Sequence, residues 1–229
     1  MRTNNKHDKV KHFTKNELAL FFRALEKEKR RKDNGTLAYR NAIRDEAMFK
    51  LIYYCGLRAS ELSNLTLASY DENRNDIYCE RLKGGKDNTL HIVDQDVQES
   101  LKLHLEVNEP KFFLFETRSG NCINRKTIFV LMRKYCQKAG IMNTSKCHPH
   151  TLRHTRAVDM LDMGCSVYDV QFWLGHVDFH NTEIYLKFTT NQQEQLYHKL
   201  AFGQKNSKKG SVSRFDSNPR GNTHQIRAV

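Results

Sequence analysis

The sequence predicts a mostly helical protein with a small antiparallel β-sheet. Between residues 13 and 202, apolar side chains recur at helical spacing in segments that begin with capping residues. Only two short runs, 77–82 and 89–93, have the composition of β-strands, and the segment KGGKDN between them is typical of a hairpin turn. No internal repeat or boundary divides this region, so we expect a single mostly α domain.

The composition indicates a polyanionic partner. Among 229 residues, 38 Lys and Arg stand against 26 Asp and Glu, which gives a net charge of +12 and an isoelectric point near 9.4. Nucleic acid is the first candidate for such a surface, and an anionic membrane surface is the second. No run of about 18 apolar residues occurs and the amino end is polar, so we expect a cytoplasmic protein that does not enter a membrane.

The cysteines predict neither a metal site nor a disulfide scaffold. They show no C-x-x-C spacing, so we interpret them as reduced and mostly buried thiols, at positions 55, 79, 122, 136, 147 and 165. Cys147, His148 and His150 stand close together, but no second pair of ligands lies at a suitable spacing. We therefore expect no metal.

The chain begins with a basic arm and two helices. Residues 1–12 are polar and basic, and Thr14 with Glu17 then forms a capping-box pattern that starts a helix. This helix ends in the charged run 27–33, which is either a solvated helix end or, with the arm, a stripe that contacts phosphates. A second helix is expected over residues 37–55, where the apolar side chains share one face.

A further helical turn follows the break at Gly56. The segment GLRASELSNL places Arg58 near the start of this turn and Glu61 three residues later on the same side. A lone arginine in such a position is ordinarily a surface residue. For Glu61 the plain alternative is an exposed helix carboxylate.

The middle of the chain adds two more helices. Asp94 is suited to cap one that runs to about residue 107, and Asn124 is suited to cap the next, which ends at Gly140. Between them the apolar run 112–115 is either a third strand or an extended connection.

Four helices are expected toward the carboxyl end. Pro149 suits the first turn of one, and Ser166 suits the cap of the next, which ends at Gly175. A short helix should hold Tyr185, and a last amphipathic helix should cover residues 191–202.

Residues 150–185 gather side chains that suit phosphoryl chemistry. They place His150, then Arg153 three positions on, His176 within Leu-Gly-His, and Tyr185 nine residues later. A tyrosine takes over a phosphodiester only where cations surround the phosphorus and a group protonates the departing oxygen. His150 and Arg153 can face one phosphate from one helix. Alone, each of these residues has an ordinary structural explanation, and only their joint occurrence favours the chemistry.

Other parts of the chain complete this set. Arg58 can hold the phosphate from a second helix, because two planar guanidiniums match a transition state with spread negative charge. Lys83 lies on a mobile hairpin tip and reaches outward, which suits a proton donor for the leaving oxygen. Lys86 is the second candidate for this role. We interpret Glu61 as an acceptor that orients His150 or Arg58. His154 is interpreted as a structural residue that bonds a neighbouring carbonyl.

The chain resembles the tyrosine recombinase, or phage integrase, family through six positions in a fixed order. They are Arg58 in GLRASEL, Lys83 in RLKGG, His150 and Arg153 in HTLRH, His176 in LGH, and Tyr185. The resemblance covers about residues 13–202 and implies the catalytic-domain fold of that family.

The resemblance implies site-specific cutting and rejoining of DNA. Attack by Tyr185 would yield a 3′-phosphotyrosine and a free 5′ hydroxyl, with Lys83 implied as the proton donor to the leaving oxygen. His150 is our candidate general base, since free tyrosine has a pKa near 10, and His176 is expected to donate a hydrogen bond to a phosphate oxygen. No cofactor is expected, in keeping with a sequence that has neither a G-x-x-x-x-G-K-[ST] loop nor a carboxylate cluster for two metal ions.

The implied partner is double-stranded DNA with paired recombination sites. A homo-tetramer on the DNA is implied, with the last helix docked on a neighbour, and an accessory DNA-bending protein is a further candidate. We expect a basic arm at 1–12, the catalytic domain at 13–202 and a disordered basic tail at 203–229. The residues expected to contact DNA outside the catalytic set are Lys86, Lys205, Lys208 and Lys209.

The amino end departs from the usual family pattern. Most members place a helical DNA-clamping domain before the catalytic domain, whereas here FTKNEL, which is similar to the catalytic-domain start, follows after twelve residues. The chain thus resembles catalytic-domain-only members such as the fimbrial phase-variation recombinases, which HPHTLRH, RLKGG and LGHVDFHNT also favour. A truncated integrase from a prophage or mobile element is the main competitor.

Two classes of function stay open at the level of sequence. The first is a strand-exchange enzyme that performs inversion, excision or integration. The second is a DNA-binding regulatory or architectural protein of the same fold that rarely cuts. Intact Arg58, Arg153 and Tyr185 favour the enzyme, and a relaxing enzyme similar to type IB topoisomerases is a distant third. The target DNA site cannot be inferred.

Overall fold

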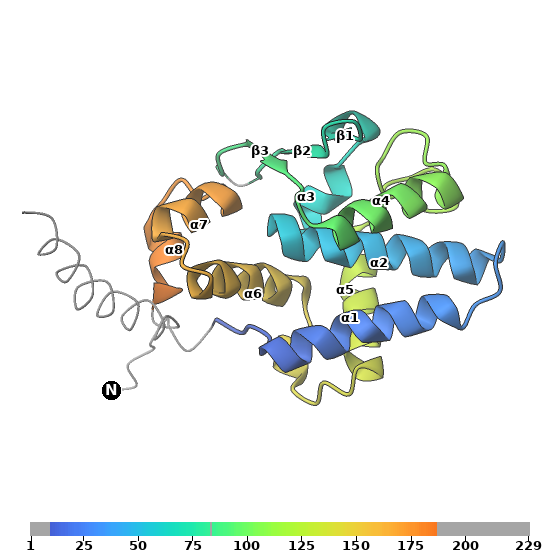
Figure 1. The fold of residues 1–229 in the computed structure, drawn as a ribbon, viewed down its shortest axis with the longest axis horizontal. Coiled ribbons are helices and arrows are strands. Elements are labelled where there is room, and N and C mark those ends of the chain that lie inside the picture. Colours follow the sequence, from blue (N-terminus) through green and yellow to red (C-terminus); the bar gives the residue numbers. More distant parts are fainter. Residues whose placement is uncertain (1–9, 83, 187–229) are drawn as a thin grey trace, which may run out of the picture. The chain divides into compact units, whose positions relative to one another are not determined.

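The computed structural model describes residues 10–82 and 84–186, and all of these residues belong to one compact unit. Lys83, the helix expected over 191–202 and the tail expected over 203–229 lie outside the described residues. The described part is mostly helical with one three-stranded antiparallel sheet, as the sequence predicts (Figure 1). In chain order its elements are α1 (Lys15–Arg30), α2 (Leu37–Cys55), α3 (Ala59–Asn64), η2 (Leu67–Ser69), β1 (Tyr70–Asp71), β2 (Asp76–Cys79), β3 (Asn88–His91), α4 (Gln95–Asn108), α5 (Arg125–Lys138), η3 (Thr144–Lys146), α6 (Pro149–Asp162), α7 (Val167–Leu174) and α8 (His180–Glu183).

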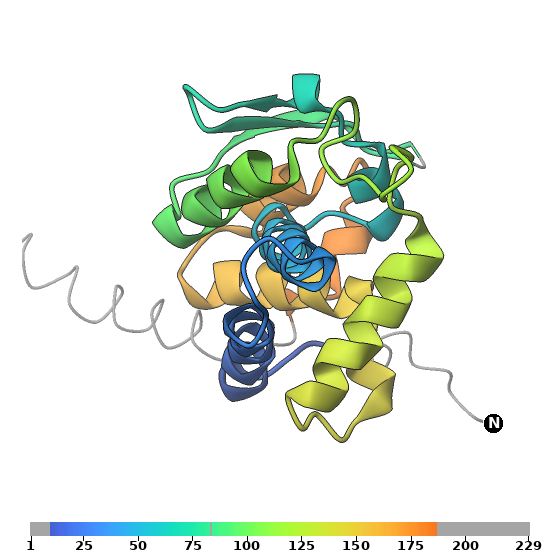
Figure 2. The same cartoon turned by 90° about the vertical axis from the view of Figure 1, so that its right-hand side faces the viewer.

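Helix α2 is the central element of the fold. Helices α1, α4 and α6 all pack against it, and Figure 2 shows α2 almost end-on among them. Its carboxyl-terminal half is buried nearly throughout. Gly56 ends α2 in the left-handed conformation, with φ of 58°, and a Cβ atom at this position would lie 2.4 Å from Leu174 Cδ2. A glycine is therefore required both by the turn and by the close approach of α7.

The capping residues that the sequence indicates begin their helices in the structure. Thr14, Asp94, Asn124 and Ser166 each accept a hydrogen bond from a backbone N–H in the first turn of α1, α4, α5 and α7. These bonds satisfy amide groups that have no partner within the helix. The predicted starts of these four helices are thus confirmed. They could be predicted because a cap depends only on residues close to it in the sequence.

The sheet is smaller than the predicted strands. Strands β2 and β3 pair with Ile77 opposite Leu90, but the pairing ends at Cys79 instead of continuing to residue 82. It ends there because the backbone N–H of Arg81 donates to Asp87 Oδ1 at 2.7 Å, which closes the hairpin through a side chain. The third strand is β1, which no sequence pattern indicated. Residues 112–115 form the extended connection, with one isolated bridge.

Tyr185 lies beyond the helix that was expected to hold it. Helix α8 ends at Glu183, and Tyr185 follows in a turn in which its backbone N–H donates to the Thr182 carbonyl at 3.0 Å. Its ring belongs to a small apolar cluster between α6 and α7, separate from the main core. Tyr185 therefore helps to anchor the carboxyl end of the described chain, together with Ile184, which packs against the same cluster.

Two expectations from composition can be compared with the fold. All six cysteines lie among the described residues and are free thiols; four are buried, and Cys122 and Cys165 are partly exposed. Within the part of the chain that the structure describes, no helix is both long and apolar enough to cross a membrane.

Candidate active site

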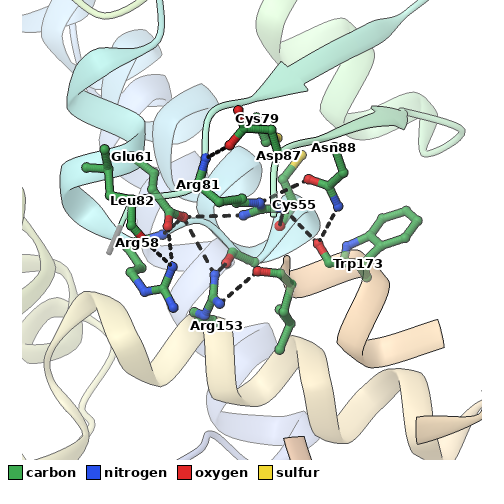
Figure 3. Close-up of polar contacts among 12 residues, drawn as sticks. Cys55, Arg58, Glu61, Cys79, Arg81, Leu82, Asp87, Asn88, Arg153 and Trp173 are labelled. Carbon is green, nitrogen blue, oxygen red and sulfur yellow. Dashed lines mark hydrogen bonds and ion pairs between the residues drawn. The ribbon is translucent and has the colours of Figure 1, made fainter. Parts of the chain in front are cut away.

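A buried carboxylate gathers three arginines at the start of α3. The Glu61 side chain is 1% exposed and contacts Arg58, Arg81 and Arg153 (Figure 3). The backbone N–H of Arg58 donates to Glu61 Oε2 at 2.8 Å, and its guanidinium donates to Oε1. The Nη1 atoms of Arg81 and Arg153 lie 3.3 Å and 3.6 Å from Oε2. Glu61 thus orients Arg58, one of the two partners expected for it, and joins Arg153 to the same centre.

The charges around Glu61 favour a bound anion. Burial alone would raise the pKa of Glu61, but Arg153, Arg58 and Arg81 hold it below its ordinary value, so the carboxylate is charged. Three guanidiniums around one carboxylate leave an excess of positive charge. Arg58, with 19% of its side chain exposed, presents this excess to solvent. The cluster therefore offers an anion site in front of α3 and α6.

Arg153 is held by the carboxyl ends of two helices. Its guanidinium donates to the Gly56 carbonyl at the end of α2 and to the Leu174 carbonyl at the end of α7, the latter at 2.9 Å. Carbonyls at helix ends carry partial negative charge, so they stabilise a buried cation. Burial and the nearby Arg58 lower the pKa of Arg153 to about 9, which still leaves it charged at neutral pH.

His176 joins Arg153 to the segment that carries Tyr185. Its Nε2 accepts from Arg153 Nη2 at 2.8 Å, so Nδ1 carries the ring proton and donates to Thr182 Oγ1 at 2.9 Å. Burial, with Arg153 and Arg58 nearby, lowers the pKa of His176 to about 3, and the ring is neutral. Donation from His176 to a phosphate requires Nε2 to leave Arg153, and that role stays a prediction.

Arg81 is a member of the site that the sequence analysis did not single out. Its side chain is fully buried and donates to Asn88 Oδ1 at 3.0 Å, to the Cys55 carbonyl at 3.1 Å and to the Trp173 carbonyl at 2.7 Å (Figure 3). Arg81 lies two residues after Cys79, the last residue of β2, and continues its alternation of buried and exposed side chains. In the predicted strand 77–82, every second side chain should face the core, and Arg81 occupies one of these positions. A charged residue at a core-facing position is the signal that could have identified it.

The hairpin docks directly on the Leu-Gly-His turn. The backbone N–H of Lys86 donates to the Gly175 carbonyl at 3.0 Å. A Cβ atom on Gly175 would lie 2.5 Å from Arg81 Cγ and 2.6 Å from the Lys86 carbonyl oxygen, so only glycine fits between these groups. This contact fixes both flanks of the hairpin tip that contains Lys83, although Lys83 itself is not described.

His150 faces solvent at the mouth of the site. It borders a hollow of about 460 Å³ that is also lined by Arg58 and, on α5, by Arg125, Lys126 and Phe129. Partial burial and nearby cations, with Arg153 the strongest of these, lower the pKa of His150 to about 4. The ring is therefore neutral at pH 7 and able to accept a proton.

The Tyr185 hydroxyl contacts His154 and not His150. Tyr185 Oη lies 2.7 Å from His154 Nδ1, and the Tyr185 side chain is almost fully buried. Burial raises the pKa of Tyr185 to about 12, although Arg153 and Arg58 act against this rise. From the sequence, His154 is interpreted as a structural residue that bonds a neighbouring carbonyl, and the structure shows its Nδ1 in contact with the Tyr185 hydroxyl instead. Its place four residues after His150, on the same helix face, was the signal for a site residue.

The arrangement of possible metal ligands can be seen among the described residues. Within residues 10–82 and 84–186, no three His, Cys, Asp or Glu side chains gather as ligands for a metal ion. The cations of this site are arginine side chains.

Comparisons with known proteins agree with this fold and site. The phage integrase family matches residues 11–192. The tyrosine recombinase XerA of Pyrococcus horikoshii is 32% identical over 69% of this chain and 55% of its own length, and XerD of Vibrio cholerae is 32% identical over 68% and 53%. The crystal structure of XerA recombinase superposes with a TM-score of 0.66, at 23% identity, over 82% of this chain and 63% of its own. The crystal structure of the XerH site-specific recombinase bound to a palindromic difH substrate superposes with a TM-score of 0.68, at 20% identity, over 82% of this chain and 52% of its own.

The chain belongs to the phage integrase family, that of the tyrosine recombinases, and has the catalytic-domain fold of this family. It spans about half the length of the curated relatives it matches.

Replacement of Glu61 by glutamine tests the charge arrangement of the site. Glu61→Gln leaves three neighbouring guanidiniums without a counter-charge, and we expect the free energy of unfolding to fall by about 3–5 kcal/mol. Urea denaturation followed by circular dichroism measures this loss.

Glu26→Gln is the matched control, because Glu26 is exposed and pairs with Arg30 at 2.6 Å on the surface of α1. Its cost should stay below about 1 kcal/mol. Equal costs for the two substitutions would contradict a central role for Glu61.

Proposed function

We propose that this chain cuts and rejoins double-stranded DNA at specific sites, through a 3′-phosphotyrosine on Tyr185. The observation that carries the proposal is the convergence of Arg58 and Arg153 on Glu61, in contact with His176 and with the segment that holds Tyr185. Paired guanidiniums stabilise the negative charge that develops when a phosphodiester is transferred to a tyrosine, and they do so without a metal.

The proposed step balances without a cofactor. A bond forms between Tyr185 Oη and phosphorus while the bond from phosphorus to the 5′ oxygen breaks. The phenol proton passes to a base, for which His150 is the residue predicted from sequence, and Lys83 gives a proton to the leaving oxygen. Arg58 and Arg153 stabilise the charge that develops on the phosphoryl oxygens. The phosphotyrosine ester retains a phosphodiester bond, so a 5′ hydroxyl can reverse the reaction.

The hollow beside the anion site supports DNA as the partner. Arg125 and Lys126 on α5 line it together with Arg58 at the start of α3, so cations from two elements would border a bound phosphate. Exposed Phe129 and Val130 lie in the same hollow and offer apolar contacts to bases or sugars. The XerH relative, solved with a difH substrate in a post-cleavage complex, adds weight to DNA cleavage.

Several finer features belong to the same proposal. We propose paired sites held by a homo-tetramer, with an accessory DNA-bending protein as a further candidate, and a catalytic domain at 13–202 flanked by a basic arm and a basic tail. A cytoplasmic recombinase of phase variation or of a mobile element fits this activity. The alternative, a binding protein of the same fold that rarely cuts, is separated from the enzyme by the next experiment.

A suicide duplex nicked close to the scissile phosphate traps the proposed intermediate. With the chain's own recombination site, the unmodified protein should form a covalent protein–DNA adduct visible by denaturing gel electrophoresis. Tyr185→Phe should form none, and Arg153→Lys should form it at least about 100-fold more slowly, because lysine cannot reproduce the bidentate contact.

Tyr168→Phe is the matched control, since this tyrosine is 72% exposed on α7 and should form the adduct at the rate of the unmodified protein. An unmodified protein that binds its site but gives no adduct would favour the binding protein over the enzyme.

The salt dependence of DNA affinity tests the proposed role of the tail. Each basic residue that neutralises a phosphate adds about 0.9 to the slope of log affinity against log salt. Deletion of residues 203–229 should therefore reduce the slope, and substitution of Lys205, Lys208 and Lys209 by glutamine should account for much of the reduction. An unchanged slope would remove the tail from the DNA interface.

A further inference from the structure

The contact between Tyr185 and His154 has no role in the chemistry proposed above. Tyr185 Oη lies 2.7 Å from His154 Nδ1, and the ring centroids are 5.6 Å apart. Tyr185 is 1% exposed, whereas a nucleophile for a DNA phosphate must meet a large polyanion at the protein surface. The observed position is therefore one in which attack cannot occur.

Two histidines on α6, together with Tyr185, show that the hydroxyl is withdrawn from the surface. His150 is exposed and borders the hollow with Arg58, while His154 follows one helical turn later and is half-buried, with its ring 6.2 Å from that of His150. Tyr185 lies beyond His154 in the apolar cluster of α6 and α7. Tyr185 therefore contacts the histidine that lies one helical turn deeper than His150.

The His154 contact satisfies the one polar atom that this position buries. The Tyr185 ring belongs to a cluster that includes Val158, Leu161 and Leu174, whose side chains offer no hydrogen-bond partner. A buried hydroxyl without a hydrogen-bond partner is costly, because an exposed hydroxyl would be hydrated by water. His154 removes this cost, and without it the Tyr185 hydroxyl would favour an exposed position.

Both partners are neutral in this contact. Burial first, and then His150 and Arg153, lower the pKa of His154 to about 3, while burial raises the pKa of Tyr185 to about 12. The hydroxyl can donate to Nδ1 when Nε2 carries the ring proton. A neutral hydrogen bond of this kind is weak enough to break when the segment moves.

We propose that His154 is a positioning residue for the nucleophile: its Nδ1 holds the Tyr185 hydroxyl in a buried resting place, and cleavage requires this hydrogen bond to break. The proposal rests on Tyr185 as the nucleophile of the proposed function. Its test needs neither DNA nor cleavage, so the two can fail separately.

Acetylation of tyrosines by N-acetylimidazole, followed by peptide mass spectrometry, reports the resting place in the full-length protein without DNA. Tyr168 serves as the accessible reference, because it is 72% exposed, and Tyr135 as the folded reference, because it is fully buried and donates to Asp45. In the unmodified protein Tyr185 should react at least about tenfold more slowly than Tyr168.

Substitution of His154 tests the hydrogen bond itself. His154→Phe and His154→Leu remove the acceptor, and Tyr185 should then react about tenfold faster than in the unmodified protein, in whichever variant leaves Tyr135 protected. His154→Asn places an amide oxygen near the position of Nδ1 and should restore most of the protection. Rescue by asparagine separates a specific hydrogen bond from a general packing role.

Two results would overturn the proposal. The first is that Tyr185 reacts as fast as Tyr168 in the unmodified protein. The second is that Tyr185 reacts as slowly in His154→Phe or His154→Leu as in the unmodified protein, in a variant that keeps Tyr135 protected. If the suicide duplex gives no adduct while these acetylation rates follow the expectation, the proposed function fails and the resting contact stands.

Discussion

The carboxylate of Glu61 is almost completely removed from water, so it can be an anion only because three guanidiniums surround it. The same contact fixes the arginines, since Arg58 at the start of α3, Arg81 in the hairpin and Arg153 on α6 come from distant parts of the chain. One negative charge thus organises several positive ones. The excess that remains faces the hollow where a phosphate would bind.

The elements that carry these arginines meet because two helices end at one place. The carboxyl ends of α2 and α7 supply the carbonyls of Cys55, Gly56, Trp173 and Leu174 as acceptors for Arg81 and Arg153. Two glycines, Gly56 and Gly175, allow this approach, since a Cβ atom at either position would collide with a neighbour. The fold therefore contributes backbone dipoles to the site as well as side chains.

Much of the fold could be predicted because its causes are local. Helix α2 and its end at Gly56, and the caps at Thr14 and Asn124, follow from spacing and from backbone chemistry that operates within a few residues. Strand β1 could not be predicted, because two residues carry no periodic pattern and pair only in the folded chain. Strand β2 was predicted to be longer than it is, because the Asp87 side chain, and not a neighbouring strand, accepts the backbone hydrogen bond of Arg81.

The site was predictable in its members but not in its contacts. Ordered motifs identified Arg58, Arg153, His176 and Tyr185, whereas burial and pairing depend on tertiary structure that one sequence does not show. Arg81 was missed because an arginine in a strand is ordinarily a solvent-facing residue. The same limit applies to the hydrogen bond between Tyr185 and His154, the residue that follows Arg153 on α6.

The central claim is that Glu61 rigidly holds, in the free protein, the arginines that are proposed to bind the phosphate. Nitrogen-15 relaxation of the arginine Nε–H groups in the free protein tests it most directly, with Arg74, whose side chain is 76% exposed, as the mobile reference. The account predicts an order parameter for Arg153 close to the value of about 0.85 for rigid backbone, and one for Arg74 below about 0.6. An Arg153 side chain as mobile as that of Arg74 would contradict it.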